Sequence, residues 1–410
     1  MKRFIMINVN QFSAIIILLF SNLFYTCLVS ASASQSEFEW KKALPESQGM
    51  SLEKLDNMWH TLKKKRTHAL VIIRNDYIVF ERYAEGYSKE KKHHTASLAK
   101  SSVGGLSLLV ALNDGLMEID DLACKYIPQW RHDSQKSKIT IKHLATNSSG
   151  ISHGKPTDKS YVSVDGWQEK FWKRNPDPFS IARDYAPVMF EPGTSYAYSG
   201  PGYAMLGYAI TASLQDEPQD DIYNLLKERI LSPIGVKETD WTIGYGRSYI
   251  VDGLKLYAIY SGSSFTPRAI ARIGRFMLRK GNWEGRQLVD PIWVEKITTY
   301  ADTPIPERIP GEPRPASGIC WWVNYDRIWP SVPPDAFVGA GAGNQVLLVV
   351  PSLNLIVVRN GGSLNQEILT QIKKYFFKII GWPRLKNDYF MNGNYEYIFN
   401  PVMESIVKID

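Results

Sequence analysis

Cysteine is scarce in this chain, with three residues among 410. Cys27 lies in an apolar segment near the N-terminus, which leaves Cys124 and Cys320 for the rest of the protein. A disulfide between these two would need an oxidising compartment, and a chain of this length can bury enough apolar surface to fold without one. We therefore expect two free thiols.

Histidine is also scarce, with seven residues and none after His153. His93 and His94 are adjacent, so they point apart on a helix or a strand, and we expect neither a metal nor another cofactor. The sequence lacks a G-x-S-x-G motif, which argues against the nucleophile turn of α/β-hydrolases. A histidine base in the Ser–Asp–His order would have to be His132, His143 or His153.

Long hydrophobic runs are absent after residue 33, so no later segment is predicted to span a bilayer. Residues 1–33 have the form of a signal peptide. Lys2 and Arg3 precede an apolar stretch, and Ala31-Ser32-Ala33 or the overlapping Val29-Ser30-Ala31 offers a cleavage site. We predict a cleaved leader and export to the periplasm or the medium.

Positive charge is in excess but dispersed. The formal net charge is +7, and removal of the leader lowers it by two. Basic residues cluster only at 63–66 and 91–92, which is more typical of a solvated surface than of a nucleic-acid footprint. We expect a small-molecule substrate and no nucleic-acid partner, and the sequence does not indicate an oligomeric state.

Strand patterns gather at the two ends of the mature chain, with helical patterns between them. Residues on both sides of Asn75-Asp76 predict one hairpin, and a second is expected around Pro351-Ser352-Leu353. The expected strands are 68–74, 77–83, 319–325, 345–350 and 354–359. The expected helices are about 51–65, 97–113, 140–146, 203–214, 221–231, 266–279 and 365–380.

This order of elements indicates an α+β fold, in which helices flank one antiparallel sheet that is closed from both chain ends and an all-α lobe is inserted. We expect residues 34–410 to form a single domain. Its α/β part covers about 44–145 and 250–380, and its helical lobe about 146–249. The tail, 381–410, has no interpretable pattern.

Ser97-Leu98-Ala99-Lys100 is the stretch that best indicates chemistry. On a helix Lys100 can reach the Ser97 hydroxyl, and a lysine that burial keeps neutral can accept its proton. Unpaired N–H groups at a helix start also suit a developing oxyanion. The same spacing occurs four more times, but only here does a long apolar segment, Val103–Leu112, follow. The structural alternative is a helix N-cap with a snorkelling lysine.

A second stretch, 191–203, is rich in glycine, proline and tyrosine and leads into a helix. A tyrosine on a turn near a lysine cation can have a lowered pKa and shuttle a proton. Tyrosines in such loops more often pack in the core, so this stretch alone does not establish a site.

Together with the glycine-rich residues 339–345, these stretches resemble the β-lactamase-related serine hydrolases. That family includes class C β-lactamases, DD-peptidases, family VIII esterases and 6-aminohexanoate-dimer hydrolases, and the resemblance covers about residues 44–380. It implies Ser97 as nucleophile, Lys100 as base and Tyr198 as proton relay. It also implies an oxyanion hole made by the backbone N–H of Ser97 and one from the glycine-rich strand. The candidate substrate and oxyanion residues are Gly200, Gly339, Gly341, Gly343 and Asn344.

Two positions depart from the family pattern. Gly200 stands where the second motif usually ends in asparagine, and Gly339-Ala340-Gly341 lacks the Lys or His of the third motif. An amide that orients an acyl-amide substrate and a cation that pairs with a carboxylate are thus both missing. We therefore favour an esterase or amidase of small, less charged substrates. A β-lactamase or DD-peptidase, and a non-catalytic binding protein on the same fold, are the alternatives.

Overall fold

The computed structural model describes residues 38–154, 166–308, 314–362 and 395–407. The signal peptide predicted at 1–33 and the helix expected at 365–380 lie outside these ranges. Among the helices within them, none combines the length and apolar character that crossing a bilayer requires.

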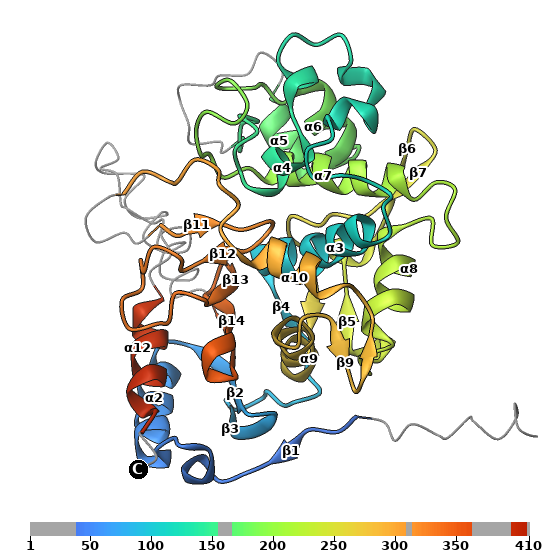
Figure 1. The fold of residues 1–410 in the computed structure, drawn as a ribbon. Helices are drawn as coiled ribbons and strands as arrows, with labels where there is room; N and C mark the ends of the chain where they lie inside the picture. Colours follow the sequence, from blue (N-terminus) through green and yellow to red (C-terminus); the bar gives the residue numbers. More distant parts are fainter. Residues whose placement is uncertain (1–37, 155–165, 309–313, 363–394, 408–410) are drawn as a thin grey trace, which may run out of the picture. The chain divides into compact units, whose positions relative to one another are not determined.

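An eight-stranded sheet lies at the centre of the fold (Figure 1). Its strands are β1 (Lys41–Lys42), β2 (Thr67–Arg74), β3 (Tyr77–Tyr83), β11 (Ala316–Ser317), β12 (Trp322–Val323), β13 (Phe337–Gly341), β14 (Gln345–Val350) and β15 (Leu355–Gly361). Their order is β1-β3-β2-β15-β14-β13-β12-β11, antiparallel throughout except for the parallel pair β1 and β3. Because β2 pairs with β15, strands from the two chain ends meet in the sheet, and the predicted α+β fold is confirmed.

Both predicted hairpins are present. In the first, Asn75 and Asp76 have φ values of 52° and 66°, the left-handed conformation that two-residue hairpin turns need to match strand twist. The second joins β14 to β15 through one 3-10 turn at Pro351–Leu353. Local turn chemistry was therefore sufficient to predict these four strands.

The single strand expected at 319–325 is confirmed only at Trp322–Val323, since residues 319–321 form a turn. The chain instead forms β11, a turn and β12, and the Gly318 N–H donates to the Trp321 carbonyl at 2.9 Å to close the turn. Cys320, at the centre of the turn, has a φ of 63° and donates its N–H to the Ala145 carbonyl at 3.0 Å. A bond to the C-terminal end of the helix at Ile141–Ala145, far away in the sequence, thus overrides the strand preference of this aromatic segment.

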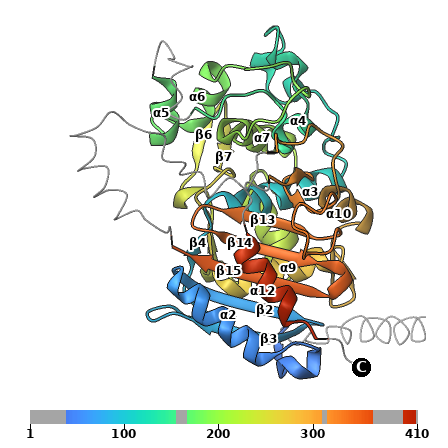
Figure 2. The ribbon, with the colours of Figure 1, turned by 90° about the vertical axis from the view of Figure 1, so that its left-hand side faces the viewer.

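Helices cover both faces of the sheet (Figures 1 and 2). α2 (Leu52–Lys64) and α12 (Glu396–Ser405) pack on one face, and α9 (Pro267–Leu278) packs on the other against β2, β14 and β15. α2 and α9 begin directly after Ser51 and Thr266, the first residues of the predicted helices, because Ser51 accepts the Lys54 N–H and Thr266 accepts the Ala269 N–H.

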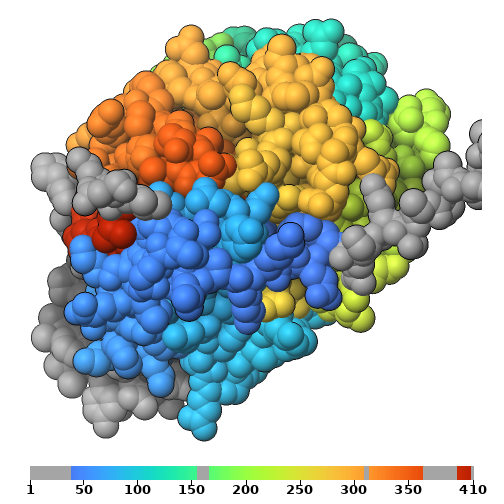
Figure 3. All heavy atoms as spheres, turned by 60° about the horizontal axis from the view of Figure 1, so that its bottom comes forward, coloured from blue at the N-terminus to red at the C-terminus, as the bar shows by residue number. Residues whose placement is uncertain are grey.

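α12 is an element that the sequence analysis missed. It lies beside α2, and the two form neighbouring red and blue surfaces in Figure 3. Tyr395 and Phe399 are fully buried, and the Phe399 ring meets Trp329 edge-on with 5.2 Å between ring centroids. The helix is specified by these partners far away in the sequence, so the local pattern of the tail could not reveal it.

Helices dominate the region between β3 and β11. Besides α9, the α-helices described there are α3 (Leu106–Asn113), α4 (Ile141–Ala145), α5 (Trp167–Lys173), α6 (Pro178–Tyr185), α7 (Gly200–Ser213), α8 (Ile222–Leu226) and α10 (Pro291–Thr298). Short strands accompany them: β4 (His93–His94), β5 (Trp241–Thr242), β6 (Tyr249–Val251), β7 (Leu254–Leu256), β8 (Ser264–Phe265), β9 (Asn282–Trp283) and β10 (Arg286–Gln287). The limits given above for the helical lobe stay a prediction.

Candidate active site

Ser97 lies on an irregular helical segment rather than on a regular α-helix. A 3-10 turn, η2 (Ala96–Leu98), leads into a π-helical segment, η3 (Lys100–Gly105), and then into α3. Ala96 has a φ of 49°, a conformation that a residue with a side chain adopts at some cost in energy. Such strain and π-helical turns are both frequent at functional sites. At the second position of η2, the Ser97 N–H has no acceptor within its own helix, so it remains a candidate oxyanion donor.

Lys100 is buried beside this serine. Its Nζ lies 3.5 Å from the Ser97 Oγ and donates to the Tyr260 carbonyl at 2.6 Å, and 6% of the residue's surface is exposed. Burial lowers the pKa of the ammonium to about 7, because no full charge replaces the lost hydration. The alternative of a snorkelling lysine does not fit this geometry.

Tyr198 packs against the same lysine. The Lys100 Nζ is 4.6 Å from the centroid of its ring and 5.2 Å from that of Tyr203. The expectation of a lowered tyrosine pKa is wrong for Tyr198: burial raises its pKa, and the Ser97 hydroxyl offsets this only in part. The phenol is therefore neutral, and within the described residues its buried hydroxyl makes no hydrogen bond of ordinary geometry.

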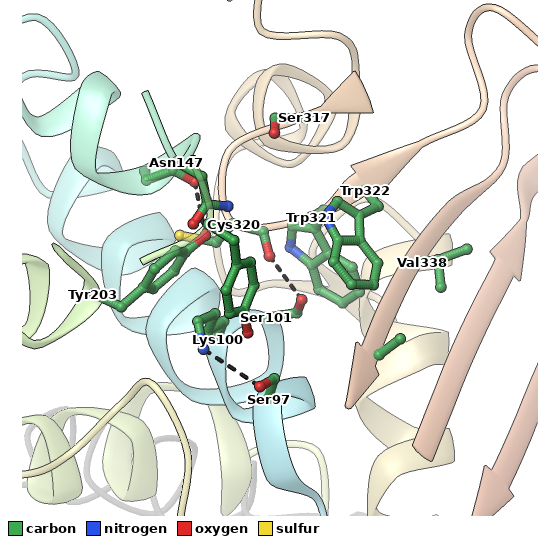
Figure 4. A pocket seen from close by; sticks show the side chains of 13 residues that line it. Ser97, Lys100, Ser101, Asn147, Tyr203, Ser317, Cys320, Trp321, Trp322 and Val338 are labelled. Carbon is green, nitrogen blue, oxygen red and sulfur yellow. Dashed lines mark hydrogen bonds between the residues drawn. The ribbon is translucent and has the colours of Figure 1, made fainter. Parts of the chain in front are cut away.

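These three side chains line one pocket (Figure 4). The full lining is Ser97, Lys100, Ser101, Ala145, Asn147, Tyr198, Tyr203, Ser317, Cys320, Trp321, Trp322, Val338 and Ala340. Lys100 is the one lysine or arginine in this set, and no histidine belongs to it. The pocket thus has aromatic and small polar walls, with its single basic side chain committed to the serine.

Gly339 and Gly341 form the strand surface on which η2 rests. A Cβ on Gly341 would lie 2.7 Å from the Ser97 N, and one on Gly339 would lie 2.6 Å from the Leu98 Cδ1. Side chains alternate along a strand, so Val338 and Ala340, the residues before each of these glycines, can line the pocket. The glycines therefore allow the close approach of the turn that carries Ser97. A donor from this strand to an oxyanion stays a prediction.

Gly343 and Asn344 lie in the turn after β13 and do not line the pocket. The Asn344 side chain donates to the Tyr397 hydroxyl of α12, and the backbone carbonyl of Asn344 accepts from Arg359 at 2.6 Å. Arg359 is 1% exposed and also donates to the Gly343 carbonyl at 3.0 Å. These hydrogen bonds hold the turn against α12 and β15. The Asn344 side chain is bound to Tyr397 and not to Ser97.

Gly200 is the first residue of α7 and is also outside the pocket lining. Its N–H donates to the His153 Nδ1 at 3.0 Å, and a Cβ added there would meet the Trp172 Cη2 at 3.0 Å. The His153 ring packs edge-on against Tyr198, with centroids 5.3 Å apart. Trp172 and His153 therefore occupy the space next to Gly200 into which a larger side chain would extend.

Sequence reasoning did not single out Asn147, Tyr203 or the pocket tryptophans, and it treated Cys320 only as a structural thiol. Cys124 and Cys320 are both free, as expected, but Cys320 also lines the pocket. Burial raises the pKa of its thiol to about 12. An asparagine before Ser148-Ser149-Gly150 was the one local signal of an unusual backbone at 147.

In the described part of the chain, no three histidine, cysteine or acidic side chains gather to hold a metal.

This fold and its buried serine–lysine pair define a class, the serine hydrolases in which lysine replaces histidine beside the nucleophile. The family model described as Beta-lactamase matches residues 56–359, and the chain therefore belongs to the beta-lactamase family. The resemblance drawn from the three motifs is confirmed, and with it the prediction that the protein is a serine hydrolase.

Two relatives illustrate the range within the family. An uncharacterised protein of Alkalihalophilus pseudofirmus is 25% identical over 77% of this chain and 93% of its own length. A "Putative D-alanyl-D-alanine carboxypeptidase" of Salmonella agona is 25% identical over 52% of this chain. The match spans about half, 51%, of the length of that relative.

Solved structures share the fold at low identity. A "Putative 6-aminohexanoate-dimer hydrolase" from Bacillus anthracis has a TM-score of 0.58 at 18% identity and covers 83% of this chain and 87% of its own. A family VIII carboxylesterase has a TM-score of 0.59 at 14% identity over 80% of this chain and 95% of its own. At these identities the likeness extends to the fold alone.

Proposed function

We propose that the protein is an exported esterase or amidase that cleaves small, uncharged substrates through an acyl-enzyme on Ser97. The observation that carries this proposal is the position of Lys100, buried with its Nζ 3.5 Å from the Ser97 Oγ and with a pKa lowered to about 7. At neutral pH a substantial fraction of such a lysine is an uncharged amine, which is the form that can accept a proton.

In the proposed acylation, the Lys100 amine accepts the proton of the Ser97 hydroxyl as the oxygen attacks the substrate carbonyl. The oxyanion that forms is stabilised by the Ser97 N–H and by a second N–H from β13. When the bond to the leaving group breaks, the Tyr198 phenol donates its proton to the departing alcohol or amine, and the Lys100 ammonium restores it. Water then attacks the acyl-enzyme with the same base, which releases the acid and frees Ser97.

The charge of the lining supports uncharged substrates. A carboxylate bound beside the nucleophile needs a cation that is not itself part of the reaction. Lys100 is the single basic side chain in the lining, and it is the proposed base. Neutral esters, and amides with small groups on both sides of the bond, therefore match the pocket better than peptides that end in a carboxylate.

The test is a panel of p-nitrophenyl acetate and butyrate, small anilides, nitrocefin and a D-Ala-D-Ala peptide, together with labelling by a fluorophosphonate. We expect ester turnover and labelling, and Ser97→Ala should abolish both. The matched control is Ser102→Ala, since the Ser102 hydroxyl is buried and bonded to the Leu98 carbonyl outside the pocket. Full activity of Ser97→Ala would overturn the mechanism.

The same panel separates the alternatives. Faster hydrolysis of nitrocefin or of the D-Ala-D-Ala peptide than of any ester would replace the esterase proposal by a penicillin-recognising enzyme, in line with the name of the Salmonella relative. Failure of the folded protein to be labelled or to turn over any substrate would favour a binding protein. Export is tested by expressing the full chain and determining the N-terminus of the secreted or periplasmic protein, which we expect near residue 34.

A further inference from the structure

The geometry points to Asn147 as the residue that positions Tyr198, through hydrogen bonds to the main chain on both sides of that tyrosine. This inference rests on the proposed function and adds to it a residue from a separate loop. The Asn147 carbonyl accepts the Ala197 N–H at 2.8 Å, and its side-chain Oδ1 accepts the Ser199 N–H at 3.2 Å. The tyrosine lies between these two anchored residues.

Tyr198 needs such an external anchor. Its hydroxyl makes no hydrogen bond of ordinary geometry within the described residues, so its own polar group does not fix the ring. The tyrosine also precedes the start of α7, where the Ser199 Oγ accepts the Gly202 N–H at 2.9 Å. A shift of Ser199 would therefore move both the helix start and the phenol that faces Lys100.

Asn147 is suited to this task by its backbone and its burial. It is 4% exposed, lines the pocket and has a φ of 60°, in the left-handed region that asparagine tolerates better than most residues. This conformation lets one residue direct both its carbonyl and its side chain toward the 197–199 segment. The Ser199 N–H can donate only to the oxygen of the Asn147 carboxamide. This bond therefore fixes the orientation of the carboxamide, with its Nδ2 directed away from Ser199.

Three variants distinguish the contribution of the Asn147 side-chain hydrogen bond from that of its left-handed backbone. Asn147→Gly keeps the left-handed backbone and the carbonyl bond but loses the Oδ1 acceptor. Asn147→Asp restores an acceptor of the same length. Asn354→Gly is the matched control, since Asn354 also has a positive φ, 44°, but lies in the turn between β14 and β15.

The readout is the dependence on the leaving group. A p-nitrophenolate leaves without a proton, whereas methoxide must be protonated by Tyr198. We expect Asn147→Gly to raise the ratio of kcat/KM for p-nitrophenyl butyrate over methyl butyrate about tenfold, because a misplaced proton donor affects only the poor leaving group. The Asp variant should return the ratio to the wild-type value, and Asn354→Gly should not change it. The added charge of the Asp variant acts on both substrates alike.

A double-mutant cycle makes the test independent of stability. In a Tyr198→Phe background, Asn147→Gly should produce no further change in the ratio, since its effect passes through the phenol. Rates are normalised to the fraction labelled by fluorophosphonate, and Asn147→Ala replaces the glycine variant if that variant does not fold.

The positioning role would be overturned if Asn147→Gly lowered kcat/KM equally for both substrates. It would also be overturned if the ratio of the two kcat/KM values in Asn147→Asp stayed as high as in Asn147→Gly. If Ser97→Ala is inactive and the Asn147→Gly ratio stays at the wild-type value, only this inference fails. If Ser97→Ala remains active, the proposed function itself fails.

Discussion

Lys100 and Ser97 form a pair that is connected to neutral groups only. The Lys100 Nζ lies 3.5 Å from the serine hydroxyl and 2.6 Å from the Tyr260 carbonyl, and both are uncharged acceptors. Partial charges of this kind do not replace the hydration that a buried ammonium loses, so the neutral amine is favoured. The same burial that makes the lysine a usable base also makes its charged form unfavourable in the folded protein.

The first prediction concerns the pH dependence of acylation. In the proposed mechanism the active form of Lys100 is the neutral amine, which predominates above its pKa of about 7. We therefore expect kcat/KM for a neutral ester to rise about tenfold per pH unit below pH 6 and to level off above about pH 8. Burial raises the pKa of Tyr198, so no decline is expected just above neutrality. Stopped-flow or steady-state rates from pH 5 to 10 measure the profile, and a midpoint near that of an ordinary lysine would contradict the assignment.

A second prediction compares two buried lysines. Lys100→Met should lower kcat/KM by about a thousandfold, because it removes the proposed general base while keeping the volume of the side chain. Lys136 is the matched control: it is 7% exposed and donates to the Arg183 carbonyl at 2.7 Å, as Lys100 does to Tyr260, but it does not line the pocket. Lys136→Met should retain activity within about threefold in its folded fraction. Comparable losses in both variants would indicate a structural effect of removing any buried lysine.

The difference in stability between the wild type and Lys100→Met should depend on pH, with the wild type gaining stability relative to the variant as the pH rises. The folded lysine has a pKa of about 7 and the unfolded one about 10.5, so between these values the unfolded state binds more protons. The free energy of unfolding of the wild type therefore rises with pH in this window, relative to the variant. We expect Lys100→Met to have the higher Tm at pH 6, by a few degrees, and to lose this advantage by pH 10. Thermal melts at both pH values test this, and a constant difference would contradict it.

The sequence predicted those parts of the fold that depend on local chemistry. The turn at Asn75-Asp76 and the caps at Ser51 and Thr266 use preferences that a few adjacent residues determine. The strand at 319–325 and the tail helix were predicted poorly, because a bond from Cys320 to Ala145 and the burial of Phe399 against Trp329 decide them. These contacts join residues far apart in the chain.

In the candidate site, too, the features set by adjacent residues could be predicted, and those set by distant contacts could not. The Ser97–Lys100 spacing predicted their contact because one helical turn brings them together. The raised pKa of Tyr198 depends on burial by several elements and could not be anticipated from its loop. The same is true of Asn147, whose two bonds reach a segment some fifty positions later in the chain.

Restoring the family asparagine at Gly200 should not restore a family substrate. A Cβ at this position would lie 3.0 Å from the Trp172 Cη2 and 3.7 Å from the His153 Cε1. We expect Gly200→Asn to lower the free energy of unfolding by about 1–3 kcal/mol through overpacking and to give no gain in nitrocefin turnover. Adding Trp172→Ala should recover part of the stability lost by Gly200→Asn. Denaturant unfolding of the single and double variants checks this, and a fully stable single variant would show that Trp172 moves freely.

Gly341→Ala should move Ser97 away from β13, the strand against which its turn packs. The added methyl group would overlap the backbone at Thr95 and lie 2.7 Å from the Ser97 N, and neither backbone group can rotate away. The turn η2 must then shift from β13, which would move Ser97 from Lys100 and displace its N–H from the oxyanion. We expect kcat/KM to fall by about a hundredfold, because catalytic groups tolerate displacements of less than about 1 Å.

The control for this variant is Gly207→Ala, a buried glycine of α7 whose added Cβ would lie 3.2 Å from the Ile259 side chain. A flexible side chain can yield by a few tenths of an ångström, so this variant should keep its activity within about threefold. Fluorophosphonate labelling rates and ester kinetics on both variants measure the difference. Equal activities would mean that the close approach of β13 to Ser97 is not needed for catalysis, and that the glycines of the third motif serve packing alone.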